Sequence, residues 1–157
     1  MVAAEDTPGW VCKQAIVAAV KGLNLDGIGD NVISQIRPDG NNISYPAVLV
    51  CSMGLLPTEQ SGTTEHKDSE FIYHIWIADR DWATQHEKEP KYQDWRHRID
   101  LALDAIHLTD GKNPDPLPAY ALTMPLPPLD EFLAQMPQYA HLVSGIQVRV
   151  VYREARP

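Results

Sequence analysis

Residues 70–80 form the most apolar segment of the chain and predict a buried strand. Their sequence, Glu-Phe-Ile-Tyr-His-Ile-Trp-Ile-Ala-Asp-Arg, is apolar at odd and even positions alike. Successive side chains of a strand point to opposite faces. One face should then hold Phe71, Tyr73, Ile75 and Ile77, and the other Ile72, His74, Trp76 and Ala78. A strand of this kind needs apolar cover on both faces.

Four other segments predict the rest of a sheet. Residues 32–37 mix apolar and polar side chains and stop at Pro38, while residues 46–53 contain the run Ala-Val-Leu-Val-Cys, which is typical of a central strand covered on both sides. Residues 119–124 predict a short edge strand, and residues 144–153 a last strand. In the last strand we expect Ile146, Val148, Val150 and Tyr152 to point inward, and Gln147, Arg149 and Arg153 outward.

Helical periodicity predicts two helices. The first runs from Pro8 to Leu23, with Thr7 as N-cap and proline at the first helical position. The second covers residues 87–108, with Pro90 in its first turn, and stops at Asp110-Gly111. Its apolar stripe has spacings of three and four. The stripe consists of Tyr92, Trp95, Ile99, Ala102, Leu103 and Ile106.

The connections differ in character. Residues 38–42, Pro-Asp-Gly-Asn-Asn, predict a hairpin loop between the first two strands. The polar and charged residues 54–69 predict either a mobile loop or an extended hairpin arm. Residues 113–137 hold 7 of the 13 prolines, which excludes a continuous helix there but leaves room for a helical turn over residues 129–136.

Together these elements predict a single α+β domain over residues 1–157. We expect a mainly antiparallel sheet of about four to five strands, packed with two main helices and carrying an extended loop arm. Two helices of moderate length can cover roughly one sheet face. We therefore expect the second apolar face to need a partner, such as a neighbouring subunit.

Charge and cysteine content narrow the classes of function. The chain has 13 Lys and Arg against 21 Asp and Glu, a formal net charge of −8, which disfavours tight non-specific binding to DNA. Cys12 and Cys51 suggest small buried thiols in a reducing compartment, although a Cys12–Cys51 bridge remains open. The apolar run of residues 15–20 is too short to span a bilayer, so no membrane association is expected.

No residue pattern predicts a reactive centre. The six histidines are scattered without metal-ligand spacing, and His74 is better explained as a hydrogen-bonded sheet histidine than as a ligand. The sequence Asp79-Arg80-Asp81 is better explained as a solvated corner than as a catalytic carboxylate pair. Gly27–Asp30 and Ser144-Gly145 are expected to be plain turns. We therefore expect no catalytic, cofactor-binding or metal-binding residues and no enzymatic activity.

Four aromatic residues are expected at one corner between strand and helix. They are Trp76, Trp82, Tyr92 and Trp95. Core packing and a protein interface both explain such a cluster.

The order of the segments resembles the tail terminator and tail-completion proteins of long-tailed bacteriophages, which join head and tail at the neck. The resemblance is carried by three segments: Ile75-Trp76-Ile77-Ala78-Asp79-Arg80, Tyr92-Gln93-Asp94-Trp95-Arg96, and Ser144–Glu154. It covers most of the chain and is one of layout. It implies a structural virion protein, assembled in the host cytoplasm, that forms a ring, usually a hexamer, on the head-proximal end of the tail tube.

Such a ring ends tube polymerisation and presents a docking surface to the head–tail connector or stopper protein. DNA passes through its lumen without specific binding, and no cofactor is implied. Residues 54–69 are expected to reach an adjacent subunit or the tube. The candidate contact residues are Glu59, Glu65, Lys67, Asp68, Tyr73, Trp76, Arg80, Trp82, Arg149 and Arg153.

Two alternatives remain open at this point. A head-completion or stopper protein of the neck would join the portal side instead of the tail. A small cytosolic α+β enzyme or ligand-binding domain would be a monomer or dimer with an enclosed pocket and convergent polar groups.

Overall fold

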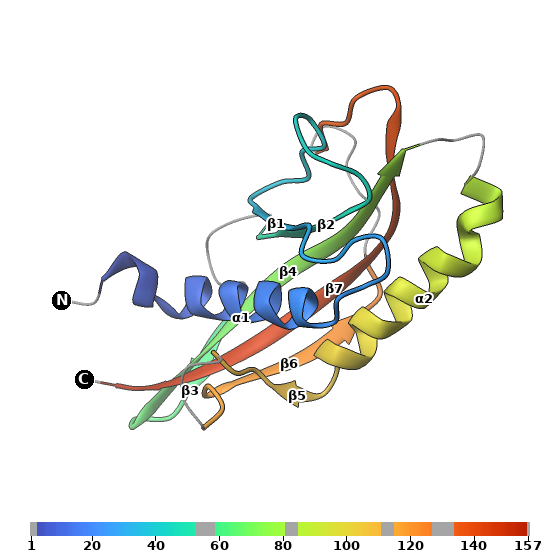
Figure 1. The fold of residues 1–157 in the computed structure, drawn as a ribbon. Coiled ribbons are helices and arrows are strands. Elements are labelled where there is room, and N and C mark those ends of the chain that lie inside the picture. The colour runs from blue at the N-terminus through green and yellow to red at the C-terminus, as the bar shows by residue number, and fades with distance from the viewer. Residues whose placement is uncertain (1–2, 53–58, 81–84, 111–114, 127–133, 157) are drawn as a thin grey trace.

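The computed structural model describes residues 3–52, 59–80, 85–110, 115–126 and 134–156. Two α-helices and a mixed, mainly antiparallel sheet confirm the α+β prediction (Figure 1). Helix α1 spans Pro8–Gly22, after a short 3-10 turn at Ala4–Asp6, and α2 spans Gln85–Leu103. The strands are β1 (Val32–Gln35), β2 (Ala47–Cys51), β3 (Glu59–Gly62), β4 (His66–Arg80), β5 (Ile106–His107), β6 (Ala119–Met124) and β7 (Ala140–Ala155).

The sheet is larger than the four to five strands expected. Six strands follow the order β1-β2-β4-β7-β6-β5, and β3 pairs with the first part of β4 as a seventh. The additional strands are short, because β3 has four residues and β5 has two, and segments of that length carry little periodicity. Strand β6 is accordingly not the sheet edge, since β5 lies outside it.

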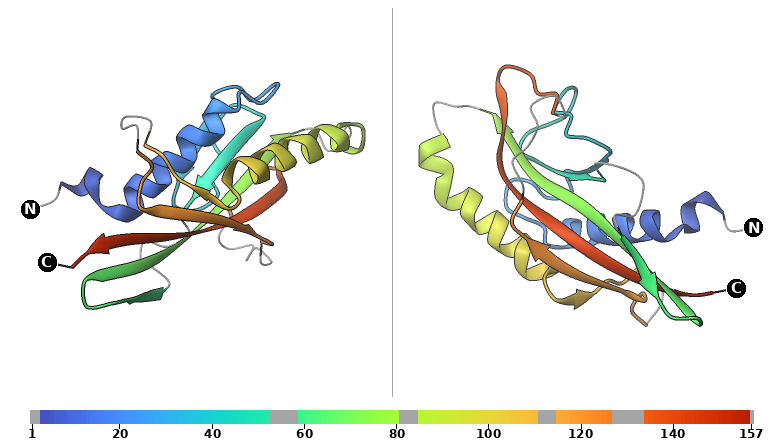
Figure 2. Two further views of the ribbon diagram at one scale, coloured as in Figure 1. Left: turned by 90° about the horizontal axis from the view of Figure 1, so that it is seen from below. Right: turned by 180° about the vertical axis from the view of Figure 1, so that it is seen from behind.

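Both helices pack on the same face of the sheet (Figure 2). The main core lies between them and the strands, and it includes Ile16 and Val20 of α1 and Trp95 and Ile99 of α2. From β4 it takes the odd-numbered side chains, as the alternation predicted. These are Tyr73, Ile75 and Ile77, with Phe71 partly buried.

Two even-numbered side chains of β4, Trp76 and Ala78, enter a second, smaller cluster on the opposite face. It holds Ala47, Leu49, Cys51, Trp76 and Ala78. The chain covers this cluster with its own loops, through Ile43, Tyr45, Leu126 and Met136. The expectation that this face needs a partner is therefore wrong at the β2 end of the sheet.

Strands β1 and β2 pair in parallel, so the predicted hairpin between them is wrong. The connection instead crosses the second face, and it carries Ile43 and Tyr45 onto the second cluster. The side chain of Gln35 holds the crossing, because its amide donates to the Asp39 carbonyl (2.7 Å) and its oxygen accepts from the Asp39 amide (3.0 Å). The turn-forming residues 38–42 correctly predicted a loop, but they did not predict that β2 runs parallel to β1.

The predicted start of α1 at Pro8 is confirmed, whereas α2 differs from the prediction at both ends. Thr7 precedes α1, but its hydroxyl donates to the Ala4 carbonyl (2.9 Å) instead of capping the helix. Helix α2 begins at Gln85, so Pro90 lies inside it, and it ends at Leu103. Ala105 has a positive φ of 53°, which stops the helix and directs Ile106 into β5.

Ser144-Gly145 is not a turn, because β7 runs continuously through both residues. Gly145 is the register partner of Trp76, and a Cβ at this position would lie 2.6 Å from a ring atom of Trp76. The predicted helical turn over residues 129–136 falls mostly outside the described residues. Cys12 and Cys51 are free and buried, and burial raises the pKa of each thiol to about 12.

Candidate assembly surface

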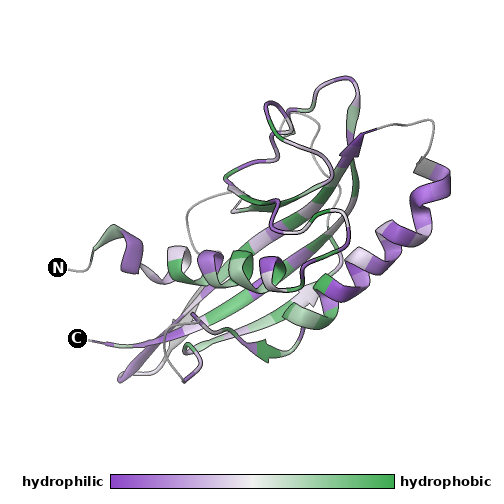
Figure 3. Cartoon of the chain, viewed as in Figure 1, coloured by the Kyte–Doolittle hydropathy of each residue, from purple (hydrophilic) through white to green (hydrophobic). Residues whose placement is uncertain are grey.

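Strands β4 and β7 extend beyond the helix-covered core and form, with β3, a projecting arm. They have 15 and 16 residues and pair along the whole length of β4, about 50 Å at 3.3 Å per residue. The hairpin of β3 and β4 forms the end of this arm (Figure 1). Of the two forms expected for residues 54–69, the described residues 59–69 form the extended hairpin. Its tip is hydrophilic, whereas the central strands are mainly apolar (Figure 3).

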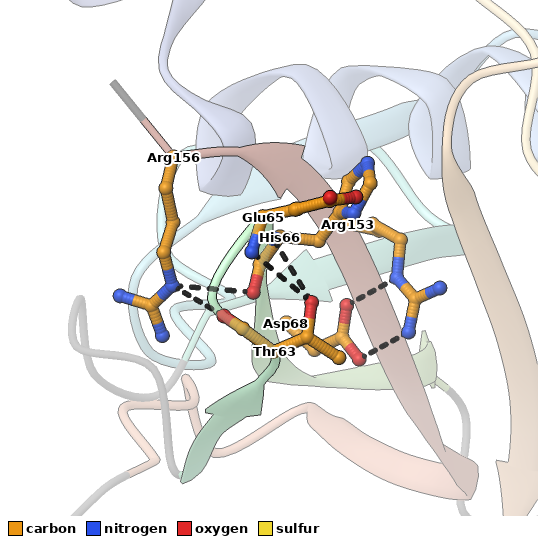
Figure 4. Close-up of polar contacts among 6 residues, drawn as sticks. All are labelled: Thr63, Glu65, His66, Asp68, Arg153 and Arg156. Atoms are coloured by element: carbon orange, nitrogen blue, oxygen red, sulfur yellow. Dashed lines mark hydrogen bonds and ion pairs between the residues drawn. The ribbon is translucent and has the colours of Figure 1, made fainter.

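Two arginines hold the tip of the arm: Arg153 in β7 and Arg156, which follows β7 (Figure 4). Arg153 donates to both carboxylate oxygens of Asp68, at 2.7 and 2.9 Å. This hydrogen-bonded pair lowers the pKa of Asp68 and raises that of Arg153. Arg156 donates from Nε to the carbonyls of Thr63 (2.7 Å) and His66 (3.3 Å).

The turn itself is closed by Thr63, whose hydroxyl accepts from the amides of Glu65 (3.3 Å) and His66 (3.2 Å). The amide of Thr63 in turn donates to the His66 carbonyl at 2.9 Å. The arm is therefore stabilised by backbone pairing and charge-assisted hydrogen bonds, because few apolar side chains are available at its tip.

The sheet face turned away from the helices is termed here the outer face, and the strand register gives its layout. Residues opposite each other in paired strands share a face. Three rows result, each with one residue from β6, β7 and β4 in turn. They are Tyr120, Val151 and Glu70; Leu122, Arg149 and Ile72; and Met124, Gln147 and His74.

Apolar side chains on the outer face are exposed to solvent. Tyr120, Leu122 and Met124 are each 38% exposed, whereas Ala119 and Ala121, which alternate with them, are buried under the helices. Neither of the two described helices lies over this face (Figure 2, right). The alternation Ala-Tyr-Ala-Leu-Thr-Met was the available signal in the sequence, but an edge strand was expected and the outward side chains were not singled out.

Buried polar atoms on the outer face lack partners among the described residues. The ring nitrogen Nε1 of Trp76, Nδ1 of His74 and Nε of Arg149 make no hydrogen bond there. Burying an unsatisfied donor costs about 1–3 kcal/mol. Arg149 does pair through Nη2 with Glu70 at 2.6 Å. The outer face thus combines exposed apolar side chains with Arg149, whose Nε has no partner among the described residues.

The candidate contact residues fall into distinct places. Asp68 and Arg153 form the clamp of the arm, Arg149 lies on the outer face, and Glu65 is exposed at the hairpin turn. Lys67 is half-buried, Arg80 is exposed at the end of β4, and the backbone of Glu59 pairs with Glu70. Trp82 lies outside the described residues.

Tyr73 and Trp76 are corrections to that set, because both side chains are buried within the chain. The hydroxyl of Tyr73 donates to the Gly9 carbonyl at 2.6 Å under α1. Trp76 packs in the second cluster, on the face opposite Tyr92 and Trp95, so the predicted aromatic corner does not form around it. Because β4 is apolar at odd and even positions alike, its sequence could not show that the chain's own loops cover Trp76.

Asp79 is buried, so the predicted solvated corner is wrong. One carboxylate oxygen accepts from the Tyr92 hydroxyl at 2.7 Å and lies 3.4 Å from Nζ of Lys88, and the other accepts from the Arg80 amide at 2.8 Å. These bonds tie α2 to the end of β4. Asp81, the second carboxylate of the sequence pattern, lies outside the described residues.

The described residues contain no group of three or more His, Cys, Asp or Glu able to hold a metal ion. His74 has Gln147 as a hydrogen-bond partner, and burial lowers the pKa of this histidine. No helix among the described residues is long and apolar enough to cross a membrane. No protein-family model matches the chain, and a search of curated proteins returns no match.

Proposed function

We propose that this chain is a structural virion protein of a phage neck, which caps the head-proximal end of the tail tube as a ring, most simply a hexamer. The ring ends tail polymerisation and offers a docking surface to the head connector or stopper protein. DNA passes through its lumen without specific binding, and the ring needs neither catalysis nor a cofactor. Assembly takes place in the host cytoplasm, and the mature protein resides in the virion.

The outer face is the observation that carries this proposal. Three large apolar side chains of β6 lie exposed, and the buried Nε of the neighbouring Arg149 has no partner among the described residues. Exposed apolar surface of this kind marks sites of association, and a cyclic ring buries one such patch in every subunit. A second copy of the chain or another virion protein would cover these apolar side chains.

The projecting arm supports the same proposal. It extends two long strands past the core and holds their end with arginine clamps, although the arm adds little to the buried core of a monomer. An arm of this shape is suited to reach an adjacent subunit or the tail tube. The layout of the elements, which resembles tail terminators, remains a further support.

Two variants of a single exposed leucine test the role of the outer face. Leu122 lies on the outer face and Leu101 on α2, with exposures of 38% and 64%. We expect Leu122→Lys to reduce an assembly of about six chains to single chains, because a charge would be buried in the interface. Leu101→Lys, the matched control, should leave the mass unchanged. Multi-angle light scattering on the purified proteins measures both.

Electron microscopy of phage particles then distinguishes termination from other roles. Particles lacking the protein, or carrying Leu122→Lys, should have overlong or uncapped tails. Heads that leak DNA beside normal free tails would instead favour the alternative of a stopper protein. Two results together would contradict the proposal: a wild-type protein that is monomeric both in solution and on tails, and normal tails in particles that lack it. They would favour a small enzyme or ligand-binding domain.

A further inference from the structure

A pocket of about 620 Å³ lies beside the first turn of α1, at a notch in the sheet. Strand β2 pairs with residues 74–78 of β4 and β3 with residues 67–70, so residues 71–73 have neither as a neighbour. The pocket lies against these three residues. Its other walls are Pro8, Trp10, Ile36 and Ser52, with Lys13 among the lining side chains. Its volume is in the range of ligand-binding pockets.

Lys13 gives this mainly apolar pocket one buried positive charge. Its side chain is only 4% exposed, and Nζ donates to the Gln35 carbonyl and to the Ser52 hydroxyl (3.2 Å). Both acceptors are neutral, and Lys13 forms no ion pair with the carboxylates in the described part of the chain. Glu5 lines the rim of the pocket but is exposed and does not pair with Lys13. Burial lowers the pKa of Lys13, as expected where the charged form lacks a counter-ion.

The amino end of α1 adds to the positive character of the pocket. The first turn of this 15-residue helix contains no acidic side chain, and Thr7 does not cap it. Residues 7–10 line the pocket, so the positive end of the helix dipole lies beside the ammonium group of Lys13. A carboxylate in the pocket would offset the cost of burying the lysine.

The rim of the pocket resembles a protein interface more than the mouth of a small-molecule site. Trp10 is 44% exposed and Ile36 53% exposed, and both line the pocket. Large aromatic and aliphatic side chains around a desolvated pocket are typical anchors of protein partners. A small molecule inside the pocket would leave these side chains in solvent, whereas a peptide segment would cover them.

We propose that this pocket binds a partner-protein segment that carries a carboxylate between large apolar side chains. The carboxylate accepts from Nζ of Lys13 and from the hydroxyl of Ser52. The flanking apolar side chains pack on Trp10, Ile36 and Phe71. This inference goes beyond the proposed function, because it holds for an isolated chain and does not require a ring.

A peptide array tests the pocket directly on the full chain. The probes are nonapeptides with a central glutamate flanked by Leu, Ile, Phe or Met in all combinations, and the same array with a central glutamine. We expect glutamate peptides to bind about tenfold more tightly than their glutamine counterparts, since a charge-assisted hydrogen bond is stronger than a neutral one. Fluorescence anisotropy of the tightest pairs gives the ratio.

Three variants test whether the peptides bind in the pocket. Lys13→Met should remove the preference for glutamate, whereas Lys21→Met, an exposed lysine on the same helix, should keep it. Trp10→Ala leaves the buried core intact and should weaken glutamate and glutamine peptides alike by about tenfold. If Lys13→Met does not fold, Trp10→Ala still tests whether the peptides bind in this pocket.

Five outcomes would overturn the inference. Four are equal binding of both arrays, no binding to either array, an undiminished glutamate preference in folded Lys13→Met, and unchanged affinity in Trp10→Ala. The fifth is decanoate binding more tightly than every peptide, which would favour a small aliphatic acid. None of these results bears on ring formation, which the light-scattering experiment tests separately.

Discussion

Gly145 lies in β7 opposite Trp76, where the indole ring occupies the space that a side chain at position 145 would need. A Cβ built on Gly145 would lie 2.6 and 2.8 Å from two atoms of that ring. Trp76 belongs to the second cluster and is held by Leu49, Cys51 and neighbouring loops. The glycine therefore allows a large aromatic side chain to pack flat on the sheet.

Gly145→Ala should lower the free energy of unfolding by about 1–3 kcal/mol, because the new methyl group overpacks a buried ring. The matched control is Gly22→Ala at the end of α1, where an added Cβ meets nothing within 4 Å. The control should leave stability unchanged or raise it by up to about 1 kcal/mol. Urea unfolding followed by circular dichroism measures both, and equal effects of the two variants would contradict the packing argument.

At the scale of elements, the arm and the core depend on different interactions. The core of the sheet is held by apolar side chains from α1, α2 and the central strands. The arm is held by backbone pairing and by the clamp between Asp68 and Arg153. Because such an arm adds few apolar contacts, it can open locally without unfolding the domain.

Asp68→Asn should loosen the arm and leave the thermal midpoint of the domain unchanged. We expect faster amide hydrogen exchange in residues 63–68 and a lower yield of the proposed ring. Asp26→Asn, which alters the exposed pair of Asp26 and Lys91 (3.4 Å), is the control and should change neither. Unchanged exchange in the arm of Asp68→Asn would show that the clamp does not hold it.

The sign of the pKa shift gives the pH range of the clamp. Arg153 lowers the pKa of Asp68, so the folded carboxyl is the stronger acid. Its stabilising effect is complete above the ordinary Asp pKa of about 3.9 and is lost as the pH falls through the lowered value. The arm should therefore stay closed from neutral to mildly acidic pH.

At the scale of the whole molecule, the net charge of −8 disfavours binding to DNA. Binding to duplex DNA depends on Lys and Arg that displace counter-ions, and here carboxylates outnumber them by 21 to 13. We expect no shift of duplex DNA in a native gel even at about 50 mM salt, where such contacts are strongest. A shift that disappears with added salt would contradict the proposal that DNA passes through the ring without being bound.

Local periodicity was sufficient for much of the fold. The alternation in residues 70–80 correctly assigned both faces of β4, and the stripe of Tyr92, Trp95 and Ile99 correctly identified the buried side of α2. These features depend on residues close in sequence, whose side-chain directions follow from strand and helix geometry. The clamp residues Asp68 and Arg153 were also named, but not their contact, which joins residues 85 positions apart.

The sequence by itself determined the fold class, the identity of the main elements and the acidic charge, because each follows from composition or from a period of a few residues. Only the tertiary structure decided the parallel pairing of β1 with β2, the covering of Trp76 by the chain's own loops, and the pocket around Lys13. Those features arise where distant segments meet, and the choice among possible meetings depends on the packing of the entire chain.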